Sequence, residues 1–292
     1  MNSHRTLWIV LLIMALIVCS CCAITAAIAG STINRSVDWK NLRWHDIETL
    51  GTGAEVTGQF THSASVTEPV NLVVDVPVGN ITVKAGDDSK VALQATKRAW
   101  GWNHSQAEKV LDAMTVDFEQ SGNQVRISAR GLTGVEDVPR SPQVDVTISV
   151  PDETAVELAS NVGRILIAGT RADVDIKADV GEVTLRDVAP SRSLQVATRV
   201  AAIELGGRLA DRAAYRLTSD IGRIILSLPP DSSFSVDARS DIGSVSVEFP
   251  VVEHNSGQGF VGEEVRGDVG TNPTTQLYLR SRIGSISVRP DR

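Results

Sequence analysis

Cysteine is nearly absent from this chain, and aromatic residues are few. The three cysteines among 292 residues are Cys19, Cys21 and Cys22, all in one apolar segment close to the N-terminus. The rest of the chain therefore has no disulfide to hold it together and must be stabilised by packing. Aromatic residues make up 4% of the chain, whereas valine, isoleucine, serine, threonine and glycine are abundant, a composition typical of thin stacked strands.

The chain also lacks the residue patterns of most enzymes. Its five histidines are scattered without metal-ligand spacing, and no cysteine or serine stands in a nucleophile context. Asp173 and Asp175 share a strand face, as the carboxylates of carbohydrate-cleaving β-helices do, but Lys177 continues that face, which favours an ordinary solvated surface. We therefore predict no enzyme, with no catalytic residue, metal or cofactor, and keep a polysaccharide-active enzyme as the minor alternative.

The net charge argues against one further class of protein, and two short motifs do not indicate others. The net charge of −7 argues against a nucleic-acid surface. Residues 257–262 match a dinucleotide-binding fingerprint literally, but no helical pattern follows, so we interpret them as a loop. Arg266-Gly267-Asp268 spells a cell-attachment tripeptide, and strings of three residues are frequent by chance.

What the chain does contain is a repeat. A seven-residue phrase of the form polar, Val/Ile, Gly, any, Val/Ile, any, Val/Leu occurs five times, with Gly163, Gly181, Gly222, Gly243 and Gly284 at its third position. A degenerate copy has Ala201 in the glycine position, and an irregular insertion separates the last two copies. Units this short cannot bury an apolar side alone, so the copies must stack and share one core, in coils of about 20 residues.

Alternation within each phrase predicts strands with one buried face. Superposing the copies predicts three inward-pointing columns. The first column is Val162, Val180, Val200, Ile221, Ile242 and Ile283. The second is Ile165, Val183, Ile203, Ile224, Val245 and Ile286, and the third is Ile167, Leu185, Leu205, Leu226, Val247 and Val288. The glycine between the first two columns is predicted to form a corner.

Stacking in sequence order also predicts which side chains are neighbours along the stack. Arg199 would lie between two aspartates, Asp179 and Asp220. Asp220 would then lie directly over Asp241, a like-charge pair that is a candidate cation-binding site, with two solvated corner aspartates as the alternative.

The repeat phrases resemble those of the bacterial putative adhesin family, β-strand-repeat envelope proteins first described as a domain of unknown function. The resemblance covers about residues 70–292 and rests on VPVGNITVKAGDDSKVALQATKRAW, NVGRILIAG, DVGEVTLRDV, SDIGRIILSLPP, SDIGSVSV and SRIGSISV. It implies a single-chain β-helix held outside the cell, and it brings no set of catalytic residues.

The N-terminus predicts a membrane location. Residues 7–29 carry no charge over 23 positions, and about 20 apolar residues span a bilayer as a helix. After His4 and Arg5, an uncleaved single-pass anchor with the bulk of the chain outside is one outcome. Cleavage after Ala29 and lipidation at Cys21 are the alternatives. We predict three parts: residues 1–30 as cytoplasmic start and transmembrane or signal segment, 31–68 as a juxtamembrane spacer, and 69–292 as an all-β solenoid with one short helix.

Within the solenoid, strands are predicted near 70–76, 81–85 and 91–96. A helix follows between Ser105 and Met114, where apolar residues fall at i, i+3, i+4 and i+7. We expect it to pack on the first coils and to shield their open edge. Next to it, Trp100 and Trp102 are predicted either to clamp the helix onto the coils, the interpretation we favour, or to form a sugar-stacking platform.

Two functions from different classes follow. The first is a non-catalytic, membrane-anchored, extracytoplasmic module of the adhesin type, which binds a surface glycan, matrix or cell partner. The second is an envelope structural or sensory module that acts through a membrane protein partner. The candidate binding residues are Trp100, Trp102, Asp220 and Asp241.

Overall fold

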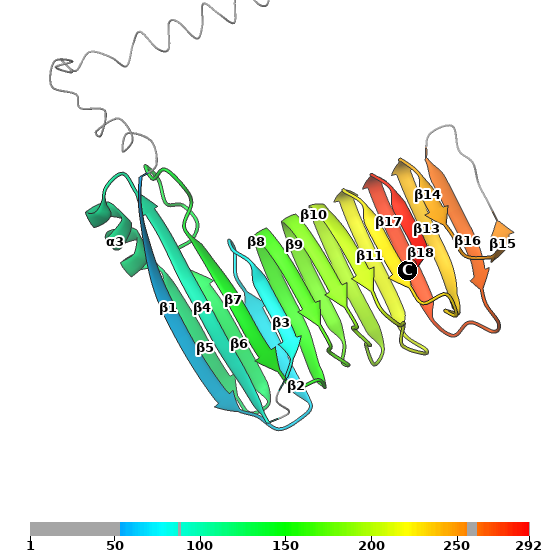
Figure 1. Cartoon of the computed structure of the whole chain (residues 1–292), viewed down its shortest axis with the longest axis horizontal. Helices are drawn as coiled ribbons and strands as arrows, with labels where there is room; N and C mark the ends of the chain where they lie inside the picture. Colours follow the sequence, from blue (N-terminus) through cyan, green and yellow to red (C-terminus); the bar gives the residue numbers. More distant parts are fainter. Residues whose placement is uncertain (1–52, 87–88, 256–261, 292) are drawn as a thin grey trace, which may run out of the picture. The chain divides into compact units, whose positions relative to one another are not determined.

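The structure is a computed structural model, and it describes residues 53–86, 89–255 and 262–291. These residues lie in one compact unit, Thr52–Arg292. The unit is almost entirely β, with a single described helix, and its strands stack as a β-solenoid (Figure 1). The all-β fold class with one short helix is therefore confirmed.

The strands form two layers joined along one corner. In the middle of the stack, β8 (Thr154–Ala168), β9 (Val174–Arg186) and β10 (Ser193–Gly206) each run through both layers and pair in parallel along nearly their whole length. The first layer continues with β2 (Val70–Asp75), β5 (Thr115–Ser121), β6 (Gln124–Arg130), β11 (Ala214–Ile221), β13 (Phe234–Ile242), β15 (Val251–Asn255), β16 (Glu263–Val269) and β17 (Gln276–Ile283). The second layer continues with β1 (Ala54–Ser65), β3 (Ile81–Ala85), β4 (Lys90–Gly101), β7 (Gln143–Val150), β12 (Ile224–Leu228), β14 (Val245–Val247) and β18 (Ile286–Pro290).

The order of coils in space departs from their order in the sequence near both ends. Near the N-terminus, β2 lies between β6 and β8, and β3 lies between β7 and β8. The departure near the C-terminus has the same form. β17 pairs in parallel with β11 on one side and with β13 on the other. In the second layer, β18 lies in the same way between β12 and β14. The last coil of the chain is thus inserted between two earlier ones (Figure 1), and the predicted irregular insertion is the antiparallel pair β15 and β16, which lies beyond them.

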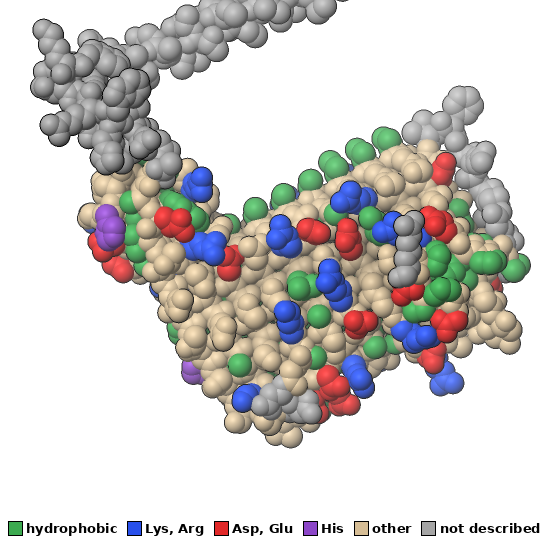
Figure 2. All heavy atoms as spheres, in the orientation of Figure 1, with side chains coloured by type: hydrophobic (Ala, Val, Ile, Leu, Met, Phe, Trp, Pro, Cys, Tyr) green, Lys and Arg blue, Asp and Glu red, His purple; other side chains and the backbone are tan. Residues whose placement is uncertain are grey.

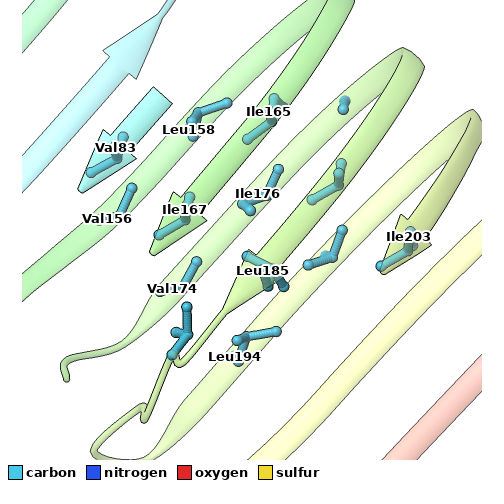
Figure 3. Packing of buried hydrophobic residues seen from close by; sticks show 14 of the residues in the cluster. Val83, Val156, Leu158, Ile165, Ile167, Val174, Ile176, Leu185, Leu194 and Ile203 are labelled. Carbon is cyan, nitrogen blue, oxygen red and sulfur yellow. The ribbon is translucent and has the colours of Figure 1, made fainter. Parts of the chain in front are cut away.

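The core between the layers confirms two of the three predicted columns. The second column is buried throughout, from Ile165 at 0% exposure to Val245 at 9%. The third is also buried, except that Val247 is only partly covered. Figure 3 shows members of both columns, such as Ile165 and Leu185, packed with Val174 and Ile176 of the first layer.

The first column was predicted to point inward, and this prediction is wrong. Its six side chains are 42–53% exposed. The reason is the corner itself: Val180 and Val183 are three residues apart, an odd spacing that places side chains on opposite faces of a strand. Gly181 turns the chain without restoring the phase, so Val180 stays outside at the corner.

The corner is built from a glycine column and a hydroxyl column. Gly222 has φ of 152°, a conformation that side chains rarely adopt, and a Cβ there would overlap the carbonyl of Ala201 in the next coil. Beside it, the buried hydroxyls of Ser219, Ser281 and Ser240 donate to the carbonyls of Ala201, Gly222 and Gly284 at 3.2, 3.0 and 2.7 Å. The repeat phrase predicts the glycines but not the serines, whose burial depends on this pairing.

The N-terminal end corrects the predicted spacer. β1 begins at Ala54 and pairs with β4 along its entire length, so the folded unit starts well before residue 69. The low apolar content of this segment, which suggested a spacer, fits an outermost strand with a single neighbour. The predicted strands near 70–76, 81–85 and 91–96 are confirmed as β2, β3 and β4.

The predicted helix is confirmed as α3 (His104–Ala113), capped by the Asn103 side chain, which accepts from the Gln106 amide at 2.9 Å. Ala107 is buried, and α3 packs on β1 and β4. At the same end of the stack, the ring centroids of His62 in β1 and Phe118 in β5 lie 4.4 Å apart. In the described part of the chain no helix has the length and apolarity to cross a membrane. Residues 7–29 lie outside the described residues.

Candidate functional site

A groove of about 450 Å³ lies on the outer face of the first layer. It crosses five neighbouring strands, in the spatial order β9, β10, β11, β17 and β13. A row of alternating charges runs along it, and we call these residues the charge ladder: Asp179, Arg199, Asp220, Arg282 and Asp241.

The charge ladder exists because the last coil is inserted out of order. Sequence order predicted Asp220 directly over Asp241, but Arg282 of β17 lies between their strands and donates to Asp220 at 2.8 Å. The like-charge pair on which the cation site was predicted is therefore not formed. Among the described residues, no group of three or more potential metal ligands converges on one point.

Arginine–carboxylate contacts link the ladder. Arg199 donates from Nε to Asp179 at 2.7 Å, as the stacking argument predicted, and this contact raises the pKa of Arg199. Arg239, next to the groove, donates to Asp241 at 3.0 Å. The Arg199 and Arg282 side chains are 67% and 64% exposed, so these pairs contribute little to stability and leave guanidinium N–H groups facing solvent.

Hydroxyl and cationic groups complete the groove. Thr198, Thr218, Ser219 and Ser281 line it, and all four hydroxyls donate to backbone carbonyls of neighbouring strands. Lys177 and Arg280 add positive charge, so four cations stand against three carboxylates in the lining. A surface of this kind offers many hydrogen-bond donors and acceptors and a slight excess of positive charge.

Side chains that contact the groove lining lie on the same outer face of the first layer. Arg280 contacts Asp237 at 2.8 Å, and Arg266 contacts it at 3.3 Å. Burial alone would raise the pKa of Asp237, but the two arginines outweigh it and lower that pKa. Next along β17, the ring of Tyr278 lies under the guanidinium of Arg216, 5.0 Å from its centre. Sequence reasoning missed Tyr278, because only the inserted coil brings it beside Arg216.

The two tryptophans do not form a platform. Trp100, in β4, is 7% exposed, whereas Trp102, before α3, is 59% exposed. Burial of Trp100 agrees with the packing interpretation for that residue. Trp100 lies in β4, whereas Asp220 belongs to the coil whose second-layer strand is β12. Between these two strands lie β7, β3, β8, β9 and β10, so the four predicted site residues do not converge.

Other sequence candidates have structural roles. Asp173 accepts from the Ser191 hydroxyl and from the amides of Arg192 and Ser193, and these bonds outweigh burial and lower its pKa. Asp173 therefore stabilises the backbone turn that contains these three residues. The Arg266-Gly267-Asp268 tripeptide lies within β16, where Arg266 contacts Glu264 at 2.6 Å and Asp268 accepts from Ser235 at the same distance. Residues 257–261 of the fingerprint lie outside the described residues.

Comparison with known proteins gives a family description and several structural likenesses. Residues 70–184 match the family model described as "ToastRack found in some PspC", less than half of the chain. The match begins at the first residue of β2 and ends in β9, so Asp220, Arg282 and Asp241 lie beyond it. No curated protein matches the chain.

Among solved structures, the chain is similar to a putative cell adhesion protein from Clostridium sporogenes, at 12% identity and a TM-score of 0.43, covering 80% of this chain and 100% of that one. A putative adhesin from Bacteroides fragilis is 15% identical with a TM-score of 0.34, over 80% and 97%. A putative lipid-binding protein from Parabacteroides distasonis is 13% identical with a TM-score of 0.30, over 80% and 97%. Two of the three carry the adhesin description that the repeat phrases indicated, but at this similarity no ligand passes from them to this chain.

Proposed function

We propose that the chain is a non-catalytic, extracytoplasmic binding module of the adhesin type, which holds a polysaccharide in the groove. The observation that carries this proposal is the charge ladder, because it places exposed guanidinium and carboxylate groups at the spacing of adjacent strands along an open groove. Strands in a sheet lie about 4.8 Å apart, so the ladder is a regular row of polar groups. A chain of sugar residues carries hydroxyls at which both kinds of group can bind.

The groove favours binding over hydrolysis. Glycosidases need two carboxyl groups that flank one bond, one as acid and one as base or nucleophile. In the ladder, an arginine stands between successive aspartates. With four cations and three carboxylates in the lining, we propose a neutral or weakly acidic polysaccharide as ligand.

Anchoring is part of the same proposal. The uncharged run of residues 7–29 is long enough to span a bilayer, and the unit Thr52–Arg292 has its own core and its own strand pairings. We propose a single-pass protein of the cell membrane with this unit outside.

The test is binding of the fragment 52–292 to an array of bacterial and host polysaccharides and to whole cells. A cooperative thermal transition first verifies that the fragment is folded. We expect saturable binding that is lost on heating and that Arg282→Ala weakens about tenfold, the loss of one charge-assisted contact of about 1.5 kcal/mol. The matched control is Arg289→Ala, an exposed arginine on β18 outside the groove. Equal binding by both variants, or no binding by the folded fragment, contradicts the proposal.

A second candidate is an envelope module that acts through a membrane protein partner. It is favoured by the family description, which assigns the matched domain to some PspC proteins. In that case residues 7–29 provide specificity. Replacing them with an unrelated apolar anchor then abolishes partner capture, whereas polysaccharide binding by the groove is unaffected by the exchange.

A further inference from the structure

An exposed apolar row follows the outer corner of the stack. We call it the corner ridge, and in spatial order it consists of Val162, Val180, Val200, Ile221, Ile283 and Ile242. Each side chain is 42–53% exposed, and consecutive members are partners in the strand register. Figure 2 shows a row of hydrophobic side chains along one edge of the unit.

The corner ridge is not required by the corner alone. Threonine has the same branched shape and would satisfy strand preference at an exposed position. All six coils nevertheless carry valine or isoleucine there, while the outward positions just before the ridge are mostly charged. Six positions at about 4.8 Å make a continuous apolar strip roughly 24 Å long. A strip of this kind, rimmed by polar residues, marks an interaction surface.

The rims of the corner ridge indicate what kind of partner fits. One rim is the charge ladder, in which aspartate and arginine alternate. The other rim carries Arg164, Glu182 and Arg223 among uncharged residues, and Arg164 contacts Glu182 at 3.3 Å. Across both rims, four arginines balance four carboxylates. An anionic lipid surface attracts basic patches, which a balanced surface does not offer.

We propose that the corner ridge binds the corner ridge of a second copy of this chain, in antiparallel orientation. An alternating ladder is complementary to itself when one copy is reversed about a two-fold axis perpendicular to the ridge. In full overlap, Val200 of each copy faces Ile221 of the other, and Val180 faces Ile283. The same alignment places Asp179 opposite Arg282, and Arg199 opposite Asp220.

This alignment also leaves no like charges opposed on the other rim. Arg164 faces Ser244, Glu182 faces Ser285, and Arg223 faces Ala202. Shifting one copy by a single coil brings Asp179 against Asp220, which opposes two carboxylates. The ladder therefore fixes the register, while the apolar strip supplies the driving force. Because the same ladder lines the groove, dimerisation through the ridge competes with polysaccharide binding.

The first test is sedimentation equilibrium of the fragment 52–292 up to about 100 µM, a range that detects dissociation constants weaker than micromolar. We expect a reversible dimer. Replacing Val180, Val200 and Ile221 by threonine keeps the branched shape and should raise the dissociation constant at least tenfold with an unchanged melting temperature. The control is Val252→Thr, an exposed valine in β15 away from the ridge. A monomeric folded fragment, or equal dimerisation of both variants, overturns the proposal.

The second test measures the register. The fragment has no native cysteine, because all three lie at positions 19–22. Mixing Val200→Cys with Ile221→Cys should yield a disulfide-linked heterodimer under mild oxidation, whereas mixing Val180→Cys with Ile221→Cys, one coil out of register, should yield far less. Equal yields overturn the antiparallel alignment. Binding of the ridge to neutral or anionic phospholipid vesicles without dimerisation would overturn it in favour of a lipid surface.

Discussion

The repeat phrase stacks differently in the two halves of the solenoid. In the first half, β8, β9 and β10 follow one another in space as they do in the sequence, and only β2 and β3 lie out of order, between β8 and the later strands β6 and β7. In the second half, the chain leaves a gap beside β11, forms β13, β15 and β16, and then returns with β17 to fill it. The first half shows that the phrase alone builds a coil. The second shows that function depends on which coils become neighbours, because only the inserted coil completes the charge ladder.

The largest expected effect comes from removing the inserted coil. Deleting residues 273–292 leaves β11 and β13 without the strand that pairs with both of them, so we expect residues 214–269 to lose cooperative structure. Hydrogen exchange should show loss of protection there and retained protection in β8 to β10. Deletion of residues 291 and 292 alone is the control; of the described residues it removes Asp291, whose amide donates to the Leu228 carbonyl. Protection of β13 that survives the larger deletion would contradict the account.

Substitutions in the glycine column should rank next. Gly181→Ala in the first half and Gly284→Ala in the second each force a Cβ against a carbonyl at φ of 147°, so each should lower the free energy of unfolding by about 3 kcal/mol or more. The comparison is Ala201→Gly, at the corner that has no glycine, which should cost only about 0.5–1 kcal/mol from added backbone freedom. Urea titration measures all three. A mild effect at Gly284 alone would mean that the inserted coil is loosely held.

A buried tyrosine offers a smaller effect confined to the second half. Tyr215 is fully buried in β11, and its oxygen accepts from the Ala210 amide at 2.8 Å. Tyr215→Phe leaves that amide unpaired, so we expect a loss of about 1–3 kcal/mol. Burial raises the pKa of Tyr215 to about 12. The neutral phenol is therefore favoured in the fold, and its contribution is present below the unfolded pKa of about 10 and is lost as the pH rises towards 12.

Urea titrations of the wild type and Tyr215→Phe at pH 9 and pH 11 measure this effect. The wild type should lose stability between the two values, and the variant should lose less. Parallel losses would assign the alkaline sensitivity to other groups.

The smallest effect compares one aspartate in each half. The pKa is lowered in the fold for Asp173, which holds a turn in the first half, and for Asp237, which pairs with arginines in the second. Each contribution is present above the unfolded pKa of about 3.9 and is lost as the pH falls through the lower folded value. Asp173→Asn and Asp237→Asn should each cost about 1 kcal/mol or less at neutral pH and flatten the acid dependence. Melting temperatures at pH 3 and pH 7 test this; an unchanged pH slope in either variant counts against its aspartate.

Much of the fold could be predicted from the sequence, because the repeat phrase reports local geometry directly. The glycine corner, two buried columns, α3 and β2 to β4 followed from spacing alone. The exposure of the corner ridge was not predicted. The alternation of inward and outward side chains was extended across a bend at which that alternation shifts by one residue, as Val180 and Val183 show. Sequence spacing also cannot reveal an out-of-order neighbour. The sequence therefore predicted a pair of Asp220 with Asp241, whereas the structure pairs Asp220 with Arg282.

The candidate site was harder to predict than the fold for the same reason. Its residues come from coils that are distant in the chain, and Arg282 and Tyr278 join it only through the inserted coil. Trp100 and Trp102 drew attention because aromatic residues are rare here, yet one is buried and the other stands alone on the surface.

The insertion of the last coil, on which both the groove and the corner ridge depend, can be measured directly by disulfide formation in the fragment 52–292. Ser287 is the register partner of Ile225 on one side and of Ser246 on the other. Cysteine pairs at 225 with 287 and at 246 with 287 should cross-link rapidly, because parallel neighbours lie within disulfide reach, and the pair at 225 with 246 should not. Rapid cross-linking of 225 with 246 and none through 287 would show that the coils stack in sequence order. That result would contradict the charge ladder, and with it the proposed polysaccharide groove and the proposed dimer.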